Sequence, residues 1–198
     1  MDRNRVWLAL LMSVMVATLG GCESEEGRQA RAAQAALGDD SAVTIADDGT
    51  CRVETTICRK ISRKSGRPIG KGRQYTIAKK SSVYSLTEFS GLRQNRVYSV
   101  HLCWIRPDGK EMFRRYAEVE LSGKDEGYVA EINWKRAEDL HYVKQETFPA
   151  EGLEFSLSSR FNIAAAKNRE PGNYLFRVYL DRRLLVEEPF EVLAPQES

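Results

Sequence analysis

The chain has 198 residues, of which 42% are hydrophobic and 29% are charged. This length suits one domain with a tail, and the composition excludes collagen, a coiled coil and a membrane protein with several spans. The formal net charge is only +2, so the overall charge favours no class of partner. With two histidines, the chain has little capacity for histidine-based metal chemistry.

The beginning of the chain has the organisation of an export signal. Arg3 and Arg5 are followed by Val6–Leu19, a run of 14 residues in which only Ser13 and Thr18 are polar. A charged segment before an apolar run of this length is typical of a signal peptide. The run is shorter than the ~20 apolar residues that a permanent membrane-spanning helix needs.

The apolar run ends in Leu19-Gly20-Gly21-Cys22, which resembles the lipobox of bacterial lipoproteins. The resemblance covers residues 1–22. It implies a signal peptide over residues 1–21, cleavage before Cys22, a diacylglycerol thioether on the Cys22 sulfur, and a further acyl chain such as palmitate on its amino group. Two or three such chains hold a protein stably at a membrane, because each buried CH₂ contributes ~0.8 kcal/mol.

The resemblance also implies a location. Glu23 follows the lipid-bearing cysteine, and it is not the aspartate that retains lipoproteins of enteric bacteria in the inner membrane. The protein is therefore expected in the bacterial cell envelope, anchored by lipid in the outer membrane and facing the periplasm. Residues 22–50 predict a flexible tether with an Ala-rich stretch that could form a short helix.

From Cys51 onward, apolar and polar residues alternate with a period of two, which predicts β-strands. The clearest hairpin is Arg96–Leu121, whose turn is Pro107-Asp108-Gly109. Only Lys135–Leu140 has spacing that would suit a helix. Further strands are predicted near Val53–Ile61, Tyr75–Ile77, Val83–Leu86, Gly127–Trp134, Leu153–Leu157 and in a last hairpin spanning Tyr174–Val192.

Seven to nine short strands predict an all-β domain over residues 51–198, built as an antiparallel β-sandwich. Pro171–Leu193 resembles the final hairpin of immunoglobulin-like (Ig-like) domains in bacterial surface proteins, because Pro-Gly-x-Tyr opens a strand that returns after a short Asp-led turn. The resemblance implies an Ig-like fold, with Trp104 as a core residue of an early central strand. A transthyretin-like sandwich is the alternative. A fold of this kind does not define an activity.

Three cysteines remain besides Cys22, so at most one intrachain disulfide can form among them. Cys51 and Cys58 would lie ~20 Å apart in one extended strand and cannot pair. We favour Cys58–Cys103, because each residue lies opposite the apolar face of its strand and the two could meet on a polar face. Cys51–Cys103 and three free thiols are the alternatives. A zinc site is not expected, because no Cys-x₂-Cys pair is present.

The charges are segregated along the chain. Between Thr55 and Thr87 there are nine basic residues and no acidic one. This run predicts a site for an anionic partner, such as lipid headgroups, phosphorylated lipopolysaccharide, peptidoglycan carboxylates or an acidic protein. The alternative is a solvated loop whose charges pair with the acidic remainder. The candidate anion-binding residues are Arg59, Lys60, Arg63, Lys64, Arg67, Lys71 and Arg73.

No catalytic or nucleotide-binding motif is present, and no cofactor, metal or nucleic-acid partner is expected. His101, between two apolar strand residues, is interpreted as structural, and Asp139 near His141 lacks a nucleophile. The sequence therefore predicts a lipid-anchored, non-enzymatic binding module for an envelope component. The alternatives are a structural or assembly subunit of an envelope or secretion complex and, less favoured, a hydrolase of unrecognised type.

Overall fold

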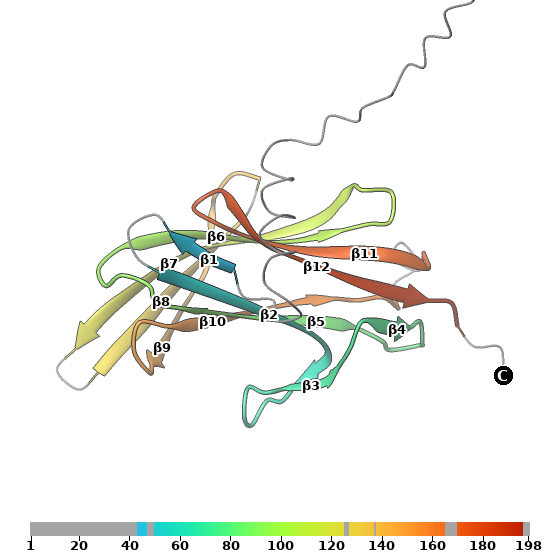
Figure 1. The fold of residues 1–198 in the computed structure, drawn as a ribbon, viewed down its shortest axis with the longest axis horizontal. Helices are drawn as coiled ribbons and strands as arrows, with labels where there is room; N and C mark the ends of the chain where they lie inside the picture. The colour runs from blue at the N-terminus through green and yellow to red at the C-terminus, as the bar shows by residue number, and fades with distance from the viewer. Residues whose placement is uncertain (1–42, 47–49, 125–126, 137, 165–169, 196–198) are drawn as a thin grey trace, which may run out of the picture.

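A computed structural model describes residues 43–46, 50–124, 127–136, 138–164 and 170–195. These residues form strands joined by turns and loops (Figure 1). The strands are β1 (Val43–Ala46), β2 (Thr50–Ile61), β3 (Pro68–Lys71), β4 (Gln74–Thr76), β5 (Val83–Ser90), β6 (Val97–Ile105), β7 (Glu111–Lys124), β8 (Gly127–Lys135), β9 (Tyr142–Ala150), β10 (Phe155–Phe161), β11 (Gly172–Leu180) and β12 (Arg183–Leu193).

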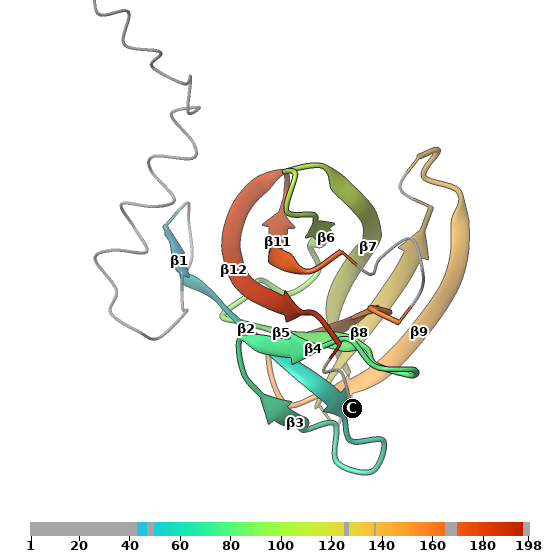
Figure 2. The ribbon, with the colours of Figure 1, turned by 90° about the vertical axis from the view of Figure 1, so that its right-hand side faces the viewer.

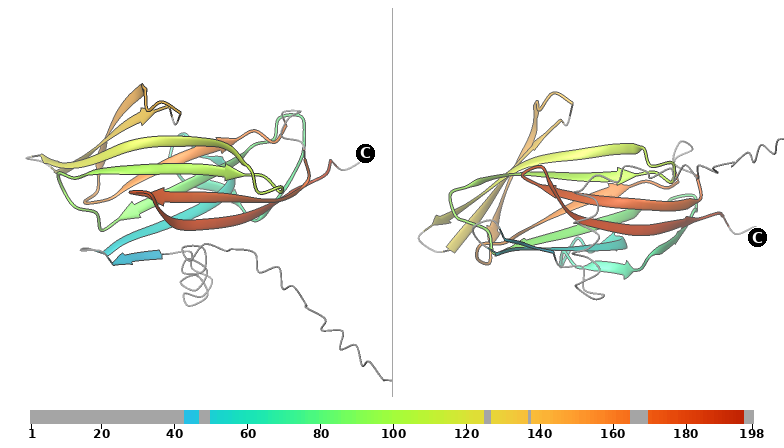
Figure 3. Two further views of the ribbon diagram at one scale, coloured as in Figure 1. Left: turned by 90° about the horizontal axis from the view of Figure 1, so that it is seen from above. Right: turned by 45° about the horizontal axis from the view of Figure 1, so that its top comes forward.

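The strands form two sheets that pack face to face (Figures 1 and 2). Sheet A has the order β1-β2-β5-β10, and β3 pairs with β2 beside that path. Sheet B has the order β4-β12-β11-β6-β7-β8-β9. All neighbouring strands are antiparallel except β4 and β12, which are parallel. Seen from above, β12 lies toward one margin of sheet B and the β8–β9 pair at the other (Figure 3).

The alternating sequence pattern produces the core between the sheets. In β10, every second residue from Phe155 to Phe161 is buried and the residues between them are exposed. In β11, the buried positions are Tyr174, Phe176, Val178 and Leu180. Since successive side chains of a strand point to opposite faces, each strand contributes one apolar row to the interior.

Trp104 lies at the centre of this core. Its side chain is fully buried, and its ring centroid is 4.7 Å from that of Phe176 and 5.5 Å from that of Phe161. The hydroxyl of Tyr174 donates a hydrogen bond to the carbonyl of Glu170 at 2.7 Å. This is the tyrosine corner of Ig-like sandwiches, in which a tyrosine near the start of a strand anchors the preceding loop. The predicted Ig-like β-sandwich is confirmed.

The sandwich begins earlier than the sequence predicted. β1 pairs antiparallel with β2, from Val43 opposite Val53 to Ala46 opposite Thr50. The end of the predicted tether therefore belongs to sheet A. The rest of that tether and Cys22 lie outside the described residues.

β9 was not predicted, and the helix-like spacing of Lys135–Leu140 was misleading. Residues 138 and 139 form a turn, and the N–H of Leu140 donates to the carbonyl of Arg136 at 2.8 Å. Leu140 has a φ of 55°, a left-handed conformation that a regular helix does not contain. Most of the β9 side chains are exposed, so the strand lacks the alternating apolar signal of the core strands.

The predicted Cys58–Cys103 disulfide is wrong, because Cys51, Cys58 and Cys103 are all free thiols. Cys58 lies in β2 of sheet A and Cys103 in β6 of sheet B. Cys103 lies opposite Trp104 on its strand, so its side chain is on the outer face of sheet B. The polar faces of the two strands belong to different sheets and do not meet.

Candidate anion-binding site

The basic segment forms the end of β2, the β2–β3 connection and β3. The connection turns back on itself through hydrogen bonds from the N–H of Ser62 to the carbonyl of Arg67 and from the N–H of Gly66 to the carbonyl of Ser62, both 2.9 Å. Arg59 and Lys60 lie near the end of β2, and Arg63 and Lys64 lie in the connection. We call residues 59–71 the basic hairpin.

The cations of this region are not neutralised by the described part of the chain. Several basic residues elsewhere are paired, as Arg96 is with Asp181 at 2.8 Å and Arg177 with Glu187 at 2.6 Å. By contrast, eight exposed basic side chains within residues 59–80 make no ion pair with any described residue. They are Arg59, Lys60, Arg63, Lys64, Arg67, Lys71, Lys79 and Lys80.

Pairing with the acidic remainder of the chain, the alternative considered from the sequence, is thus not seen among the described residues. Arg73 is the one candidate anion-binding residue that does not belong to this set of eight. Its carbonyl accepts a hydrogen bond from the N–H of Glu191 at 2.6 Å, which ties the main chain there to β12.

A pocket of about 620 Å³ lies beside the basic hairpin. Three segments far apart in the sequence line it: the end of β2, the chain from β4 to the start of β5, and the residue two positions after β10. No acidic side chain is among the lining residues, which are Arg59, Tyr75, Thr76, Ala78, Lys80, Ser81, Ser82 and Ile163.

The polar groups of this pocket are partly fixed by hydrogen bonds. The Ser81 hydroxyl accepts from the N–H of Ala78 at 2.8 Å and donates to the carbonyl of the same residue at 3.0 Å. The Ser82 hydroxyl accepts from Nε of Arg160 at 3.2 Å, which leaves its own proton available to another acceptor. Arg160 also lies over the ring of Tyr84, 5.8 Å from its centroid.

Two of the lining residues are uncharged and almost fully buried. They are Tyr75 and Ile163, and the Tyr75 hydroxyl donates to the carbonyl of Gly72 at 2.6 Å. Burial raises the pKa of Tyr75 to about 12, with a further contribution from Cys58, and the positive charge of Arg59 opposes this rise. The phenol therefore stays uncharged at neutral pH and adds no negative charge that would repel an anion.

The sequence identified only part of this pocket. Arg59 was predicted, and Lys80 belongs to the acid-free run without having been singled out. The pair Ser81-Ser82 beside two lysines was a visible signal of a polar loop. Nothing in the sequence around Ile163 marked it as a pocket residue, because only the packing of β10 beside β5 brings Ile163 to the same end of sheet A as Arg59.

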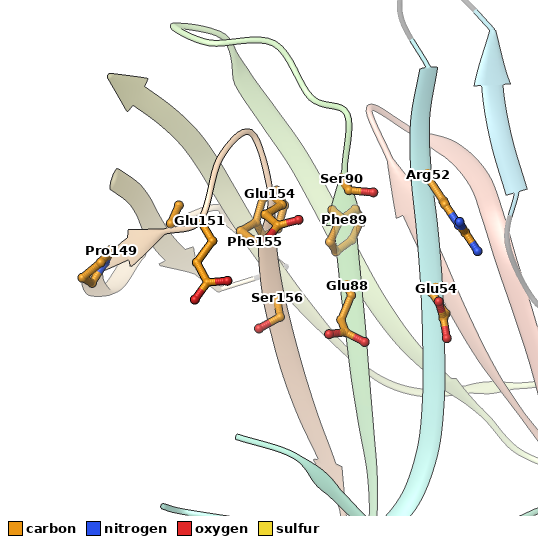
Figure 4. Close-up of a pocket in the computed structure, with 11 residues that line it drawn as sticks. Arg52, Glu54, Glu88, Phe89, Ser90, Pro149, Glu151, Glu154, Phe155 and Ser156 are labelled. Carbon is orange, nitrogen blue, oxygen red and sulfur yellow. The ribbon is translucent and has the colours of Figure 1, made fainter. Parts of the chain in front are cut away.

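The opposite end of sheet A is acidic. A groove of about 430 Å³ there is lined by Arg52 and by four glutamates that make no ion pair with a described residue. Glu54 and Glu88 are direct cross-strand partners, an arrangement that is unfavourable for like charges. Figure 4 shows these side chains together with Glu151 and Glu154. Within the described residues, no group of three metal-ligating side chains could hold a metal ion.

The two histidines lie in separate places. His101 is half-buried, with its Nδ1 3.1 Å from Nη1 of Arg114, and burial, together with that guanidinium, lowers its pKa. Cys103, two residues along the same face, is buried, and burial raises its pKa to about 12, so it is a thiol. His141 is exposed, and Asp139 accepts a hydrogen bond from its main-chain N–H at 3.0 Å.

The anchor predicted at Cys22 lies outside the described residues. None of the residues that the structure describes forms a helix of the length and hydrophobicity needed to span a bilayer.

Comparison with known proteins identifies no family for the chain. No family model and no curated protein matches it. It is similar in structure to an immunoglobulin-like protein from Pseudomonas aeruginosa, with 14% identity and a TM-score of 0.41 over 72% of this chain and 96% of that chain. It is also similar to an alkylpurine DNA glycosylase from Pseudomonas fluorescens bound to DNA containing an abasic site analog, with 12% identity and a TM-score of 0.32 over 70% of this chain and 30% of that chain.

The class of protein is therefore defined by the chain's own geometry. The strand order, the parallel pairing of β4 with β12 and the Tyr174 hydrogen bond make it an Ig-like β-sandwich protein.

Proposed function

We propose that this chain is a lipid-anchored, non-enzymatic binding module of the bacterial cell envelope that holds an anionic envelope component through the basic hairpin. The anchor is the lipid that the lipobox resemblance implies for Cys22. The Ig-like sandwich is a rigid body at the end of a tether, and the basic hairpin projects from one end of its sheet A.

The observation that supports this proposal is the cluster of eight exposed cations within residues 59–80 that make no ion pair with a described residue. Like charges held close together repel each other, so an anion that binds among them relieves an existing electrostatic cost. Each Lys or Arg near an anionic surface contributes ~1 kcal/mol to binding. The charge is also concentrated in one hairpin, which favours a directed contact over diffuse attraction.

A structural or assembly subunit that uses sheet edges is the second candidate, and β9 is the feature that favours it. β9 is an edge strand with three large exposed apolar side chains, Tyr142, Val143 and Phe148. Its edge, however, carries Lys144 and Pro149, and the register with β8 shifts near its start. These are the features by which natural edge strands avoid pairing, so we prefer the basic hairpin.

The proposal is tested with the mature lipoprotein in detergent and two anionic probes, immobilised lipopolysaccharide and purified peptidoglycan sacculi. The test variant carries Arg63→Gln, Lys64→Gln and Arg67→Gln. Loss of three charges at ~1 kcal/mol each predicts about a hundredfold weaker capture on the probe that the wild type binds. Capture by the wild type should also fall at high salt, because salt screens exposed charges.

The matched control removes the same charge elsewhere, through Lys110→Gln, Arg136→Gln and Arg182→Gln. These residues are exposed and lie outside the basic hairpin. The control should bind within about twofold of the wild type. Equal losses in the two triple variants would show that only the net charge matters, and no salt-sensitive capture of either probe by the wild type would refute the proposal.

A further inference from the structure

We infer that the pocket beside the basic hairpin is a specific binding site for a phosphate ester, with Arg59 and Lys80 holding the phosphate and the remaining, mostly polar lining holding the organic group. This inference rests on the proposed function and deepens it. It separates two parts of the basic region: a hairpin tip that attracts anions and a pocket that selects one kind of anion.

The charge of the pocket fits a phosphate. Arg59 and Lys80 line it, neither has an ion pair among the described residues, and no carboxylate lines it. A phosphate monoester carries between one and two negative charges at neutral pH, which two cations balance. The planar guanidinium of Arg59 suits two oxygens at once, and the ammonium of Lys80 acts as a point charge.

Hydroxyl groups add donors for the remaining oxygens. The Ser82 hydroxyl accepts from Arg160, so its own proton is free to point into the pocket. Thr76 lines the same space. A phosphate monoester presents three acceptor oxygens, more than a carboxylate can offer to this set of donors.

The side chain of Arg59 is held in place before any ligand binds. Gly70 has a φ of 67°, and a Cβ built on it would lie 3.2–3.3 Å from three carbons of the Arg59 side chain. The Arg59 stem therefore packs against the bare backbone of β3, which limits the positions open to its guanidinium. A residue held in this way loses less side-chain entropy when a ligand binds.

The size and lining of the pocket indicate an organic phosphate. A volume of about 620 Å³ is far larger than a bare phosphate ion needs, and typical small-molecule sites fall in this range. Apart from Tyr75 and Ile163, which are almost fully buried, the lining is mostly polar. Such a lining suits the hydroxyl groups of a sugar. The shared chemistry is a sugar phosphate, either free or as part of a glycolipid headgroup.

The test titrates the mature lipoprotein in detergent with glucose 1-phosphate, inorganic phosphate and glucose, by calorimetry. We expect glucose 1-phosphate to bind saturably at one site, inorganic phosphate to bind more weakly, and glucose not to bind. The double variant Arg59→Gln, Lys80→Gln should weaken glucose 1-phosphate binding at least tenfold. The matched double variant Lys110→Gln, Arg182→Gln should stay within about twofold of the wild type, because it removes the same charge outside both the pocket and the basic hairpin.

All four substituted residues are exposed, and unchanged thermal midpoints would show that both variants fold. Absence of saturable binding by the wild type, or equal weakening by the two double variants, overturns the inference. Binding of glucose as tight as that of glucose 1-phosphate overturns it as well, because the phosphate would then have no role.

Capture on intact and on dephosphorylated lipopolysaccharide distinguishes the two sources of the ligand. Loss of capture after dephosphorylation, with competition by free glucose 1-phosphate, assigns the pocket to a lipid-borne phosphate. Calorimetric binding with no such competition assigns it to a free sugar phosphate. The pocket inference fails and the proposed function stands if three results coincide. The triple variant Arg63→Gln, Lys64→Gln, Arg67→Gln loses capture, the double variant Arg59→Gln, Lys80→Gln keeps it, and the wild type does not bind glucose 1-phosphate. If neither variant loses capture, both fail.

Discussion

Individual polar residues decide how the centre of the sandwich is packed. The indole Nε1 of Trp104 donates a buried hydrogen bond to the Ser159 hydroxyl at 2.8 Å. Thr55 and Thr87 are hydrogen-bonded to each other on the same inner face of sheet A. These small polar side chains leave room for the aromatic rings that sheet B contributes, and their hydrogen bonds offset the cost of burying them.

Removing one partner of the Trp104–Ser159 hydrogen bond should destabilise the domain. In Ser159→Ala the buried indole N–H has no acceptor, which costs ~1–3 kcal/mol of unfolding free energy. Ser156→Ala is the control, since the same substitution at an exposed position of the same strand should stay within ~0.5 kcal/mol of the wild type. Urea denaturation measures both values.

The double variant Trp104→Phe, Ser159→Ala completes a thermodynamic cycle. Its loss should be ~1 kcal/mol smaller than the sum of the two single losses, because both partners of the bond are then absent. Strictly additive losses, or a Ser159→Ala variant no less stable than Ser156→Ala, would contradict a stabilising role for this bond.

At the scale of elements, the sequence predicted strands best where one face is buried. β6 and β11 alternate clearly, and their hairpins with β7 and β12 were predicted with their turns. β9 was missed because both of its faces are largely exposed, so no apolar row marks it. β1 was missed because it is a four-residue edge strand in a segment whose composition resembles a linker.

Edge strands also differ in how their side chains protect them from pairing with another sheet. The free edge of β10 has a cover, because Nη1 of Arg115 donates to the carbonyl of Ser158 at 2.7 Å. Within the described residues, no side chain covers the main chain of β9 in this way. Lys144 and Pro149 therefore remain as its protection against pairing with another sheet.

Removing this protection should make the protein associate. In Lys144→Val, Pro149→Thr, β9 loses the cation that pairs with Glu146 and gains an N–H donor, so copies can pair edge to edge. We expect the weight-average mass from light scattering to at least double with rising concentration. The control Lys110→Val, Pro195→Thr makes the same changes at exposed positions away from β9 and should keep the wild-type mass. A monodisperse β9 variant would contradict this account of the edge.

At the scale of the whole molecule, the sequence could not assign strands to sheets. The choice of Cys58–Cys103 failed because alternation within a strand gives the face of a side chain but not the sheet to which the strand belongs. Arg59 was found from the acid-free run, whereas Lys80, Ser82 and Ile163 join it only after three segments pack together. A site assembled from distant segments leaves little local pattern in a single sequence.

Because of the fold, the segregation of charge along the sequence becomes a separation of charge between the two ends of sheet A. Because β2 and β5 are antiparallel, the start of β2 and the end of β5 form the acidic end of sheet A. The end of β2 and the start of β5 form the basic end, with Arg59 and Ser82. A field of this kind orients the module when it approaches a charged surface, and its range shrinks as salt increases.

That orientation is useful only if the domain is held at a membrane, which the lipid anchor would provide. In cells supplied with radioactive palmitate, the wild-type chain should carry the label and migrate with membranes. Cys22→Ser should lose the label and the membrane association, because the thiol that accepts the diacylglycerol is absent. Cys51→Ser is the matched control, since it removes a buried thiol of the sandwich and should keep the label in full. An unlabelled wild type, or a label that survives Cys22→Ser, would remove the anchor and with it the envelope setting in which the basic hairpin and its pocket are expected to bind.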